Sequence, residues 1–134
     1  MIHADTRVEV PTTSRDGRTL TTRYPFGVDA DGVETFAEVR TSHYGRAEYV
    51  GRPDRVIVAT ITVVQVDHRD GISVTSWSSD MPYVRVAVDD CPRYSAKRLA
   101  ATHARALEIV EGDYGIPGGI FDDIRATAER LASA

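Results

Sequence analysis

The sequence contains a single cysteine, Cys91, and lacks every pattern that depends on cysteine pairs. One thiol cannot form an intramolecular disulfide, and the paired-cysteine spacing of a structural zinc site is absent as well. The internal histidines His43, His68 and His103 lie far apart in the sequence and show no metal-ligand spacing. We therefore expect no disulfide, no metal and no cofactor, and a reducing compartment fits the sequence.

The chain has no long apolar segment either. No stretch approaches the roughly 20 apolar residues that span a bilayer, and the residues after Met1 lack the basic start and apolar run of a secretory leader. We expect a soluble, cytoplasmic protein that does not enter a membrane. The formal net charge of -4 argues against a surface wholly devoted to binding a polyanion, but it leaves room for a local basic face.

Lysine is nearly absent. Lys97 is the one lysine among the 16 basic residues, and all the others are arginine. Together with the many alanines, valines and aspartates, this bias suggests a GC-rich source, and we hypothesise an actinobacterial or phage origin. The base composition of the source genome tests this hypothesis, which concerns codon usage and not function.

Alternation of apolar and polar residues predicts β-strands in the first two-thirds of the chain. The expected strands cover residues 7–13, 18–24, 33–44, 56–66, 72–79 and 83–88. Turns are expected at residues 14–17, 29–32 and 70–71, each of which contains an Asp-Gly pair. Pro11 cannot donate a backbone hydrogen bond, which restricts the first strand to an edge of the sheet.

The predicted strands differ in how their two faces are composed. One face of the segment 33–44 carries charged residues such as Glu38, which predicts a solvent-exposed face. The segment 56–66 is apolar on both faces and is therefore expected at the centre of the sheet. The alternate residues that form the expected apolar side of the last strand are Val84, Val86 and Val88.

Helical periodicity begins after Ser95, a predicted N-cap, and ends at Gly112. A shorter apolar stripe follows Phe121, with two aspartates in its first turn. We predict an α+β fold in one domain over residues 1–134, with an antiparallel sheet of about five or six strands within residues 7–88. Two C-terminal helices, over about residues 95–111 and 121–133, are expected to pack on this sheet.

The segment 40–55 is rich in arginine and tyrosine, and only Glu48 and Asp54 oppose its positive charge. Such a segment can neutralise phosphates and stack on bases, but arginines on an exposed strand also keep a protein soluble and prevent edge-to-edge pairing. The candidate binding residues are Arg40, Tyr44, Arg46, Tyr49, Arg52 and Arg55, with Trp77 as a further aromatic anchor for a partner.

Catalytic signals are few. Cys91 could act as a nucleophile if a histidine reached it in space; otherwise it is a small buried thiol. His68 follows Asp67 directly, and because neighbouring strand residues face opposite ways, Asp67 cannot easily orient it. His103 lies within the apolar stripe of the first helix, where we expect a core histidine that bonds a nearby carbonyl. His43 is one of the histidines that could reach Cys91, together with His68 and His103.

Two loops partly match ligand-binding patterns. The segment 27–38 has several residues of a calcium loop, but Gly27 stands where the first aspartate ligand should be, so we interpret it as an Asp-Gly turn. The glycine-rich segment 115–119 precedes a helix, but Asp122 and Asp123 in the first turn of that helix would repel a phosphate. Neither loop is a predicted site.

Two functional hypotheses follow. The first is a small binding or interaction module without catalysis, with a protein partner, acting as an accessory protein of a phage or mobile element and using a face or edge of the sheet. The alternative is a nucleic-acid-binding module that uses the segment 40–55. A third hypothesis, an enzyme, requires that Cys91 or His68 meet a second titratable group in a cleft. The sequence does not specify the oligomeric state.

Overall fold

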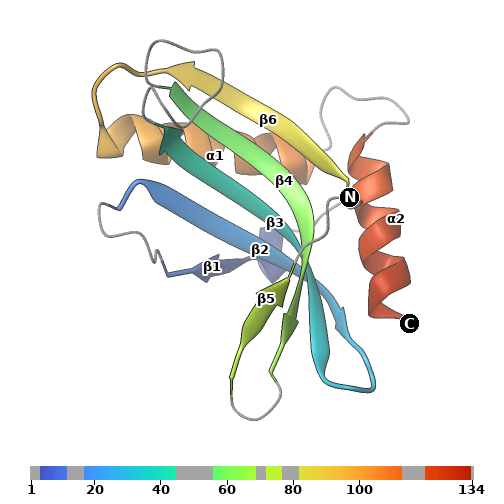
Figure 1. Cartoon of the computed structure of the whole chain (residues 1–134). Helices are drawn as coiled ribbons and strands as arrows, with labels where there is room; N and C mark the ends of the chain where they lie inside the picture. Colours follow the sequence, from blue (N-terminus) through green and yellow to red (C-terminus); the bar gives the residue numbers. More distant parts are fainter. Residues whose placement is uncertain are drawn as a thin grey trace.

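The architecture is that of a computed structural model, which describes residues 4–11, 17–44, 56–68, 72–76, 82–112 and 120–133. A 3-10 helix, η1 (Ala4–Thr6), precedes six strands: β1 (Val8–Val10), β2 (Thr19–Val28), β3 (Val33–Tyr44), β4 (Val56–Asp67), β5 (Val74–Ser76) and β6 (Tyr83–Asp90). The helices α1 (Ala96–Gly112) and α2 (Ile120–Ala132) follow (Figure 1). The predicted α+β order is thus confirmed. The predicted turn residues 14–16 and 70–71 and the loop 115–119 lie outside the described residues.

All pairs of neighbouring strands are antiparallel. The strand order is β1-β2-β3-β4-β5, and β6 pairs with β4 as well. Because β3 occupies one side of β4, β5 and β6 share the other, where β5 pairs with residues 65–67 and β6 with residues 56–62. The strand β4 is therefore central, as predicted, and β5 and β6 follow one another along the same side.

The two helices cover one face of the curved sheet, which we call the inner face (Figure 1). The main core lies between this face and the helices and includes Val39, Ile61 and Val63, none of which is exposed. On the opposite, outer face, Phe36, Val64 and Val66 form a smaller buried cluster. Both faces of β4 are thus buried, which explains its nearly continuous apolar sequence.

The outer face of β3 is not uniformly exposed to solvent, so the prediction of a wet face was wrong at Glu38. This residue is 6% exposed. Its carboxylate accepts a hydrogen bond of 2.9 Å from Nε of Arg23, its cross-strand neighbour on β2. The Arg23 guanidinium in turn lies over the Phe36 ring, 5.4 Å from the ring centre. Pairing with arginine is what allows a carboxylate to be buried here.

A β-bulge shifts the alternation within β6. Ala59 pairs with Ala87 and Thr60 with Arg85, so Val86 is the extra residue. Val86 packs on the inner core, whereas Val88 pairs with Val58 and lies on the outer face, 43% exposed. The prediction that Val84, Val86 and Val88 share one face was therefore wrong at Val88.

The helices begin and pack as their sequences predict. Oγ of Ser95 accepts a hydrogen bond of 3.2 Å from the backbone N–H of Arg98, which confirms the N-cap of α1. The buried stripe of α1 comprises Leu99, Thr102, His103, Ala106, Leu107 and Val110. In α2, Ile124 and Ala128 are fully buried against the sheet. Among the described residues, no helix is long and apolar enough to cross a membrane.

The segment that partly matched a calcium loop forms a tight turn between β2 and β3. Oδ1 of Asp29 accepts hydrogen bonds from the backbone N–H groups of Asp31, at 2.9 Å, and Val33, at 3.0 Å. Gly32 adopts a φ of 83°, which glycine tolerates far better than other residues. The Asp29 carboxylate therefore stabilises the turn itself, as the Asp-Gly interpretation expected.

Candidate binding site at strand β6 and helix α1

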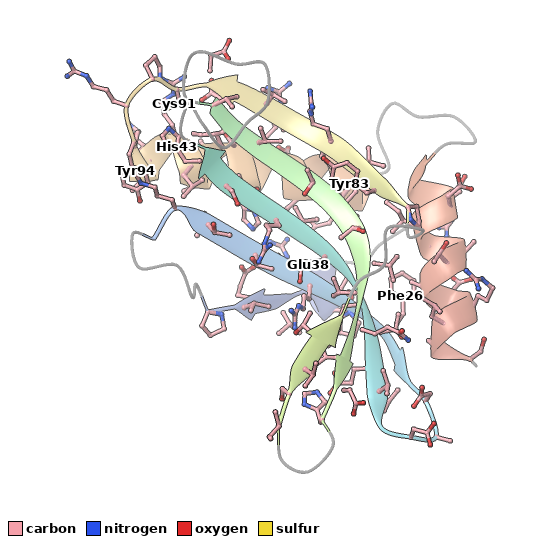
Figure 2. The ribbon with its side chains drawn as sticks, in the orientation of Figure 1. Phe26, Glu38, His43, Tyr83, Cys91 and Tyr94 are labelled. Carbon is pink, nitrogen blue, oxygen red and sulfur yellow. The ribbon has the colours of Figure 1, made fainter. Side chains whose placement is uncertain are left out.

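The strand β6 lies at an edge of the sheet. Seven of its eight residues pair with β4, and no other strand within the described ranges pairs with it. On the outer face, Tyr83 is 62% exposed and Val88 43% exposed, and Arg85 between them is exposed too. Tyr83 is seen near the start of β6 in Figure 2. An edge strand with exposed apolar side chains can pair with a further strand.

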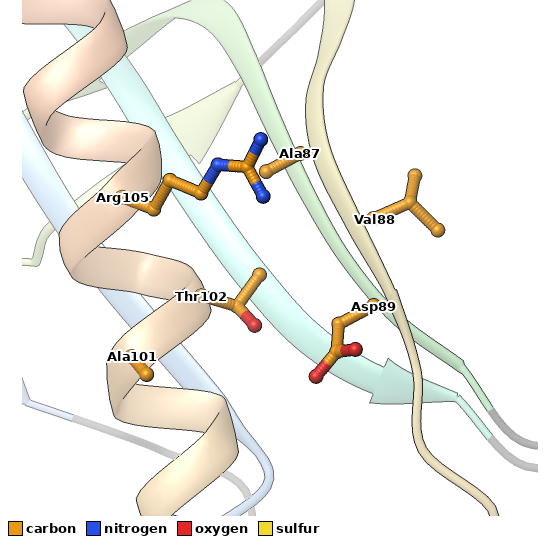
Figure 3. Close-up of a pocket in the computed structure, with 6 residues that line it drawn as sticks. All are labelled: Ala87, Val88, Asp89, Ala101, Thr102 and Arg105. Atoms are coloured by element: carbon orange, nitrogen blue, oxygen red, sulfur yellow. The ribbon is translucent and has the colours of Figure 1, made fainter.

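A groove of about 190 Å³ lies on the other side of β6, between this strand and α1. Its walls are formed by Ala87, Val88, Asp89, Ala101, Thr102 and Arg105. Figure 3 shows the Arg105 side chain reaching from α1 towards Ala87, while Asp89 faces the helix from the strand. The groove exists because alanines at positions 87 and 101 leave the space between strand and helix unfilled.

The charged side chains around the groove differ in whether they form an ion pair. Asp89 is held by Arg98, whose Nε and Nη2 donate hydrogen bonds of 2.9 and 2.8 Å to the two carboxylate oxygens. This hydrogen bonding raises the pKa of Arg98. Arg105 forms no hydrogen bond or ion pair with any other described residue. Because the charge of Asp89 is balanced by Arg98, Arg105 supplies the uncompensated positive charge of the groove.

The size of the groove limits what can occupy it. Sites for cofactors and drug-sized ligands typically have volumes of roughly 300–1,000 Å³. The groove is smaller, at about 190 Å³, and open on one side. It suits a single amino-acid side chain or a small anion better than a cofactor.

The predicted binding residues of the segment 40–55 are only partly within the described structure. Arg40 is exposed on the outer face of β3, where it pairs in register with Thr60 of β4. Tyr44 is the last residue of β3. The remaining candidates, which lie outside the described residues, are Arg46, Tyr49, Arg52, Arg55 and Trp77.

Sequence reasoning missed the groove. Arg98, Ala101 and Arg105 lie at helical spacing on the flank of α1 next to its buried stripe. Two arginines that flank a small residue at this spacing are a weak sign of a helix face that packs incompletely. The neighbouring residues of β6 could not be assigned to this face, because the bulge at Val86 changes which side chains face the helix.

Cys91 and His43 meet at one end of the sheet, near Tyr94 (Figure 2). Nε2–H of His43 donates a hydrogen bond of 2.8 Å to the backbone carbonyl of Cys91, and the buried Nδ1 has no hydrogen-bond partner among the described residues. The Cys91 thiol donates to the carbonyl of Arg93 at 2.9 Å and is 1% exposed. The histidine thus contacts the backbone and not the sulfur, which fits a structural thiol.

His103 is a core histidine, as expected, but its partners are threonine hydroxyls and not a carbonyl. Its Nε2 lies 2.8 Å from Oγ1 of Thr22, and its Nδ1 lies 2.7 Å from Oγ1 of Thr41. Thr22 donates its hydroxyl proton to Glu9 of β1, at 2.8 Å. Nε2 must therefore carry the ring proton and Nδ1 accepts from Thr41, so the network is complete with a neutral imidazole.

A second set of contacts joins β2, and the residue that precedes β1, to the end of α1. The Tyr24 hydroxyl donates a hydrogen bond of 2.7 Å to Glu111, and Arg7 pairs with the same carboxylate at 3.0 Å. Burial, together with the hydrogen bond to Glu111, raises the pKa of Tyr24. Both networks hold the first strands of the sheet against α1. The polar residues in these networks therefore have a structural role, and we do not assign them to a binding site.

The neutral state of His103 predicts a pH-dependent stability. Burial lowers the pKa of His103, an effect that Arg7 adds to and Glu9 opposes. Below about pH 6.5 the unfolded chain binds a proton that the folded chain excludes, so the free energy of unfolding falls as the pH decreases, by at most about 1.4 kcal/mol per pH unit. We expect His103→Gln to lose this dependence.

Urea denaturation of both proteins between pH 7.5 and 5.5 measures the effect. The stability of the natural chain relative to His103→Gln should decline across this range. A difference that stays constant, or grows on acidification, contradicts a neutral His103.

His68 lies at the tip of the β4–β5 hairpin in a chain of three polar groups. Its Nδ1 is 2.7 Å from Oγ of Ser73, and its Nε2 is 3.0 Å from Oε1 of Glu34. Glu34 and Ser73 therefore orient the imidazole. The order of groups is that of a nucleophile, a base and an acid, but the imidazole side chain is 44% exposed and is not among the residues that line the groove beside β6. Catalysis of this type needs a site that excludes water and stabilises an oxyanion.

Metal ligands do not gather in the part of the chain that the structure describes: no group of three or more His, Cys, Asp or Glu side chains could hold a metal ion there. Comparisons of the chain with protein-family models, with curated proteins and with solved structures each return no match. The function must therefore be inferred from the surface of β6 and α1 itself.

Proposed function

We propose that this protein is an interaction module that binds an extended segment of a partner protein along the free edge of β6. A segment added to an edge strand forms backbone hydrogen bonds, and its alternate side chains point to opposite faces of the sheet. On one face they would meet Tyr83, Arg85 and Val88, and on the other they would enter the groove beside Arg105. The single observation that carries the proposal is this coincidence of an edge that no other described strand pairs with, two exposed apolar side chains and a groove.

The exposure of Val88 supports strand addition over a purely structural edge. Proteins protect edge strands with charged residues, proline or a covering element. On the outer face of β6, Arg85 is a charged residue of this kind, but Val88 beside it is a valine that is 43% exposed. A bound segment would cover this side chain.

Selection from a displayed library of random peptides about 10 residues long, enough for one added strand, tests the proposal. Selected peptides should shift the NMR signals of β6 and of the facing side of α1. Val88→Lys should weaken their binding, because a lysine on an edge opposes an added strand. Val8→Lys is the matched control, since Val8 is similarly exposed, at 47%, on the opposite edge strand β1.

Two results would contradict the proposal. In the first, no peptide is enriched over a control selection. In the second, the NMR shifts cluster away from β6 and α1, or Val8→Lys weakens binding as much as Val88→Lys. Sedimentation of the protein alone provides a separate check, because a second copy could occupy the same edge and would appear as a concentration-dependent dimer.

Nucleic-acid binding is the second candidate, and one observation favours it. Arg40 of β3 and Arg85 of β6 both pair in register with Thr60 of β4, so the two exposed arginines flank one threonine on the outer face. Tyr83 is exposed in the adjacent row. A polar sheet face with arginines and an aromatic ring suits the backbone and bases of a single strand.

Binding of short single- and double-stranded oligonucleotides at low salt tests this candidate. Binding should weaken steeply as salt is added, and Arg40→Glu should weaken it more than Arg130→Glu on α2. No binding at low salt eliminates the candidate without affecting the proposed protein interaction.

The proposal also includes the biological context in which the protein acts. We infer an intracellular accessory role in a phage or mobile element of a GC-rich host, supported by the almost exclusive use of arginine among basic residues. The genes next to the coding sequence test this inference.

A further inference from the structure

We propose that the groove between β6 and α1 is a specificity pocket for an acidic side chain of the bound segment. This inference rests on the proposed strand addition at β6 and specifies which partners that edge accepts. It predicts a carboxylate in the groove, next to an apolar residue that faces the opposite side of the sheet, towards Val88.

The charge distribution selects the occupant. Asp89 is satisfied by two hydrogen bonds from Arg98, so it does not require a cation from a partner. Arg105 has no such partner within the described part of the chain, and its guanidinium extends across the groove (Figure 3). A carboxylate placed there would form charge-assisted hydrogen bonds with Arg105, in the paired geometry that guanidinium groups favour.

Other side chains fit the groove less well. A bound segment would shield Arg105 from water, and an apolar side chain would leave the guanidinium without compensation, which is costly. A lysine or arginine would bring two positive charges together. A large aromatic ring is disfavoured by the volume of about 190 Å³, whereas aspartate or glutamate fits over the alanines at positions 87 and 101.

The walls of the groove are suited to holding the carboxylate in place. Thr102 lies on the buried side of α1, is 7% exposed and lines the groove with its side chain. Ala87 is 9% exposed and belongs to the main core. Because both residues are fixed by packing, the pocket is largely formed before a partner binds, which reduces the entropy lost on binding.

The test uses synthetic copies of the peptides selected by the full chain. We expect the selected sequences to share an acidic residue next to an apolar residue. Replacing that acid by its amide should weaken binding about tenfold, as expected for the loss of a charge-assisted hydrogen bond. Arg105→Glu should weaken it by at least as much, and a lysine in place of the peptide's acid should restore binding to this variant.

Arg130→Glu on α2 is the matched control, because it makes the same charge change on an exposed helix position away from the groove. It should leave binding within about twofold of the natural chain. Circular dichroism and thermal unfolding of both variants establish that they are folded, which we expect because both arginines are exposed.

The possible outcomes separate this inference from the proposed function. Peptides that bind at β6 with no acidic preference, or that tolerate Arg105→Glu, overturn the acidic pocket and leave strand addition intact. Loss of binding in Arg105→Glu that the lysine peptide does not reverse also overturns it, because the pocket would then not act through charge. If no peptide binds at β6, both proposals fall.

Discussion

Replacing Ile61 by alanine is expected to lower the free energy of unfolding by about 2–5 kcal/mol, the cost of a cavity in a packed core. Ile61 lies in the middle of β4, is not exposed and packs in the main core between sheet and helices. Its neighbours in register are Val39 of β3 and Val84 of β6. With paired strands on both sides, the sheet cannot close around the missing side chain.

Ile72→Ala is the matched control, since the same atoms are removed from a residue that is 65% exposed. It should change the free energy of unfolding by no more than about 0.5 kcal/mol. Denaturant unfolding of both variants measures the difference. Equal losses, or a loss below about 1 kcal/mol for Ile61→Ala, would show that β4 is not the centre of the core.

Removing the Glu38 carboxylate should have the next largest effect. Glu38→Ala leaves Arg23, whose side chain is 17% exposed, in a largely buried position without its partner. Losing one member of a buried ion pair costs roughly 3–5 kcal/mol, and we expect a value of about 3 kcal/mol because Arg23 retains some contact with water. The free energy of unfolding measured by denaturant titration gives this loss directly.

Glu34→Ala provides the comparison on the same strand and the same face. Glu34 pairs with His68, and because its side chain is 37% exposed, its loss should cost no more than about 1 kcal/mol. The double replacement Arg23→Met with Glu38→Leu should recover most of the stability, since apolar residues of similar size can replace a buried pair. If Glu38→Ala and Glu34→Ala cost the same, Glu38 is not buried as the structure places it.

Much of the fold follows from local sequence patterns. The unbroken apolar run at 56–66 predicts a strand buried on both faces, and β4 is that strand. Ser95 and the stripe around His103 predict α1 to within one residue at each end. These features are predictable because each depends on residues close together in the chain.

The missed features depend on contacts between distant residues. The burial of Glu38 requires Arg23 on a neighbouring strand, and a single-strand pattern assigns any carboxylate to solvent. The bulge at Val86 is set by how β6 matches β4, so alternation alone placed Val88 on the wrong face. The threonine partners of His103 come from two strands that only the folded sheet brings together.

The candidate site was harder to predict than the fold. The sequence draws attention to the dense arginines and tyrosines of the segment 40–55, of which Arg40 is exposed on the outer face. The groove beside β6 is instead lined by the small alanines at positions 87 and 101 and by Arg105, which has no ion-pair partner among the described residues. A sequence shows neither the space that small side chains leave unfilled in the fold nor whether an arginine has an ionic partner there.

Amide hydrogen exchange along β6, measured by NMR with and without a selected peptide, tests the central proposal most directly. In the free protein, amides that bond to β4 should exchange slowly, while those that point away from β4 should exchange fast. The bound peptide should slow the outward-pointing amides from Tyr83 to Asp90. Outward amides that are already protected in the free protein, or that stay fast in the complex, would contradict strand addition at this edge.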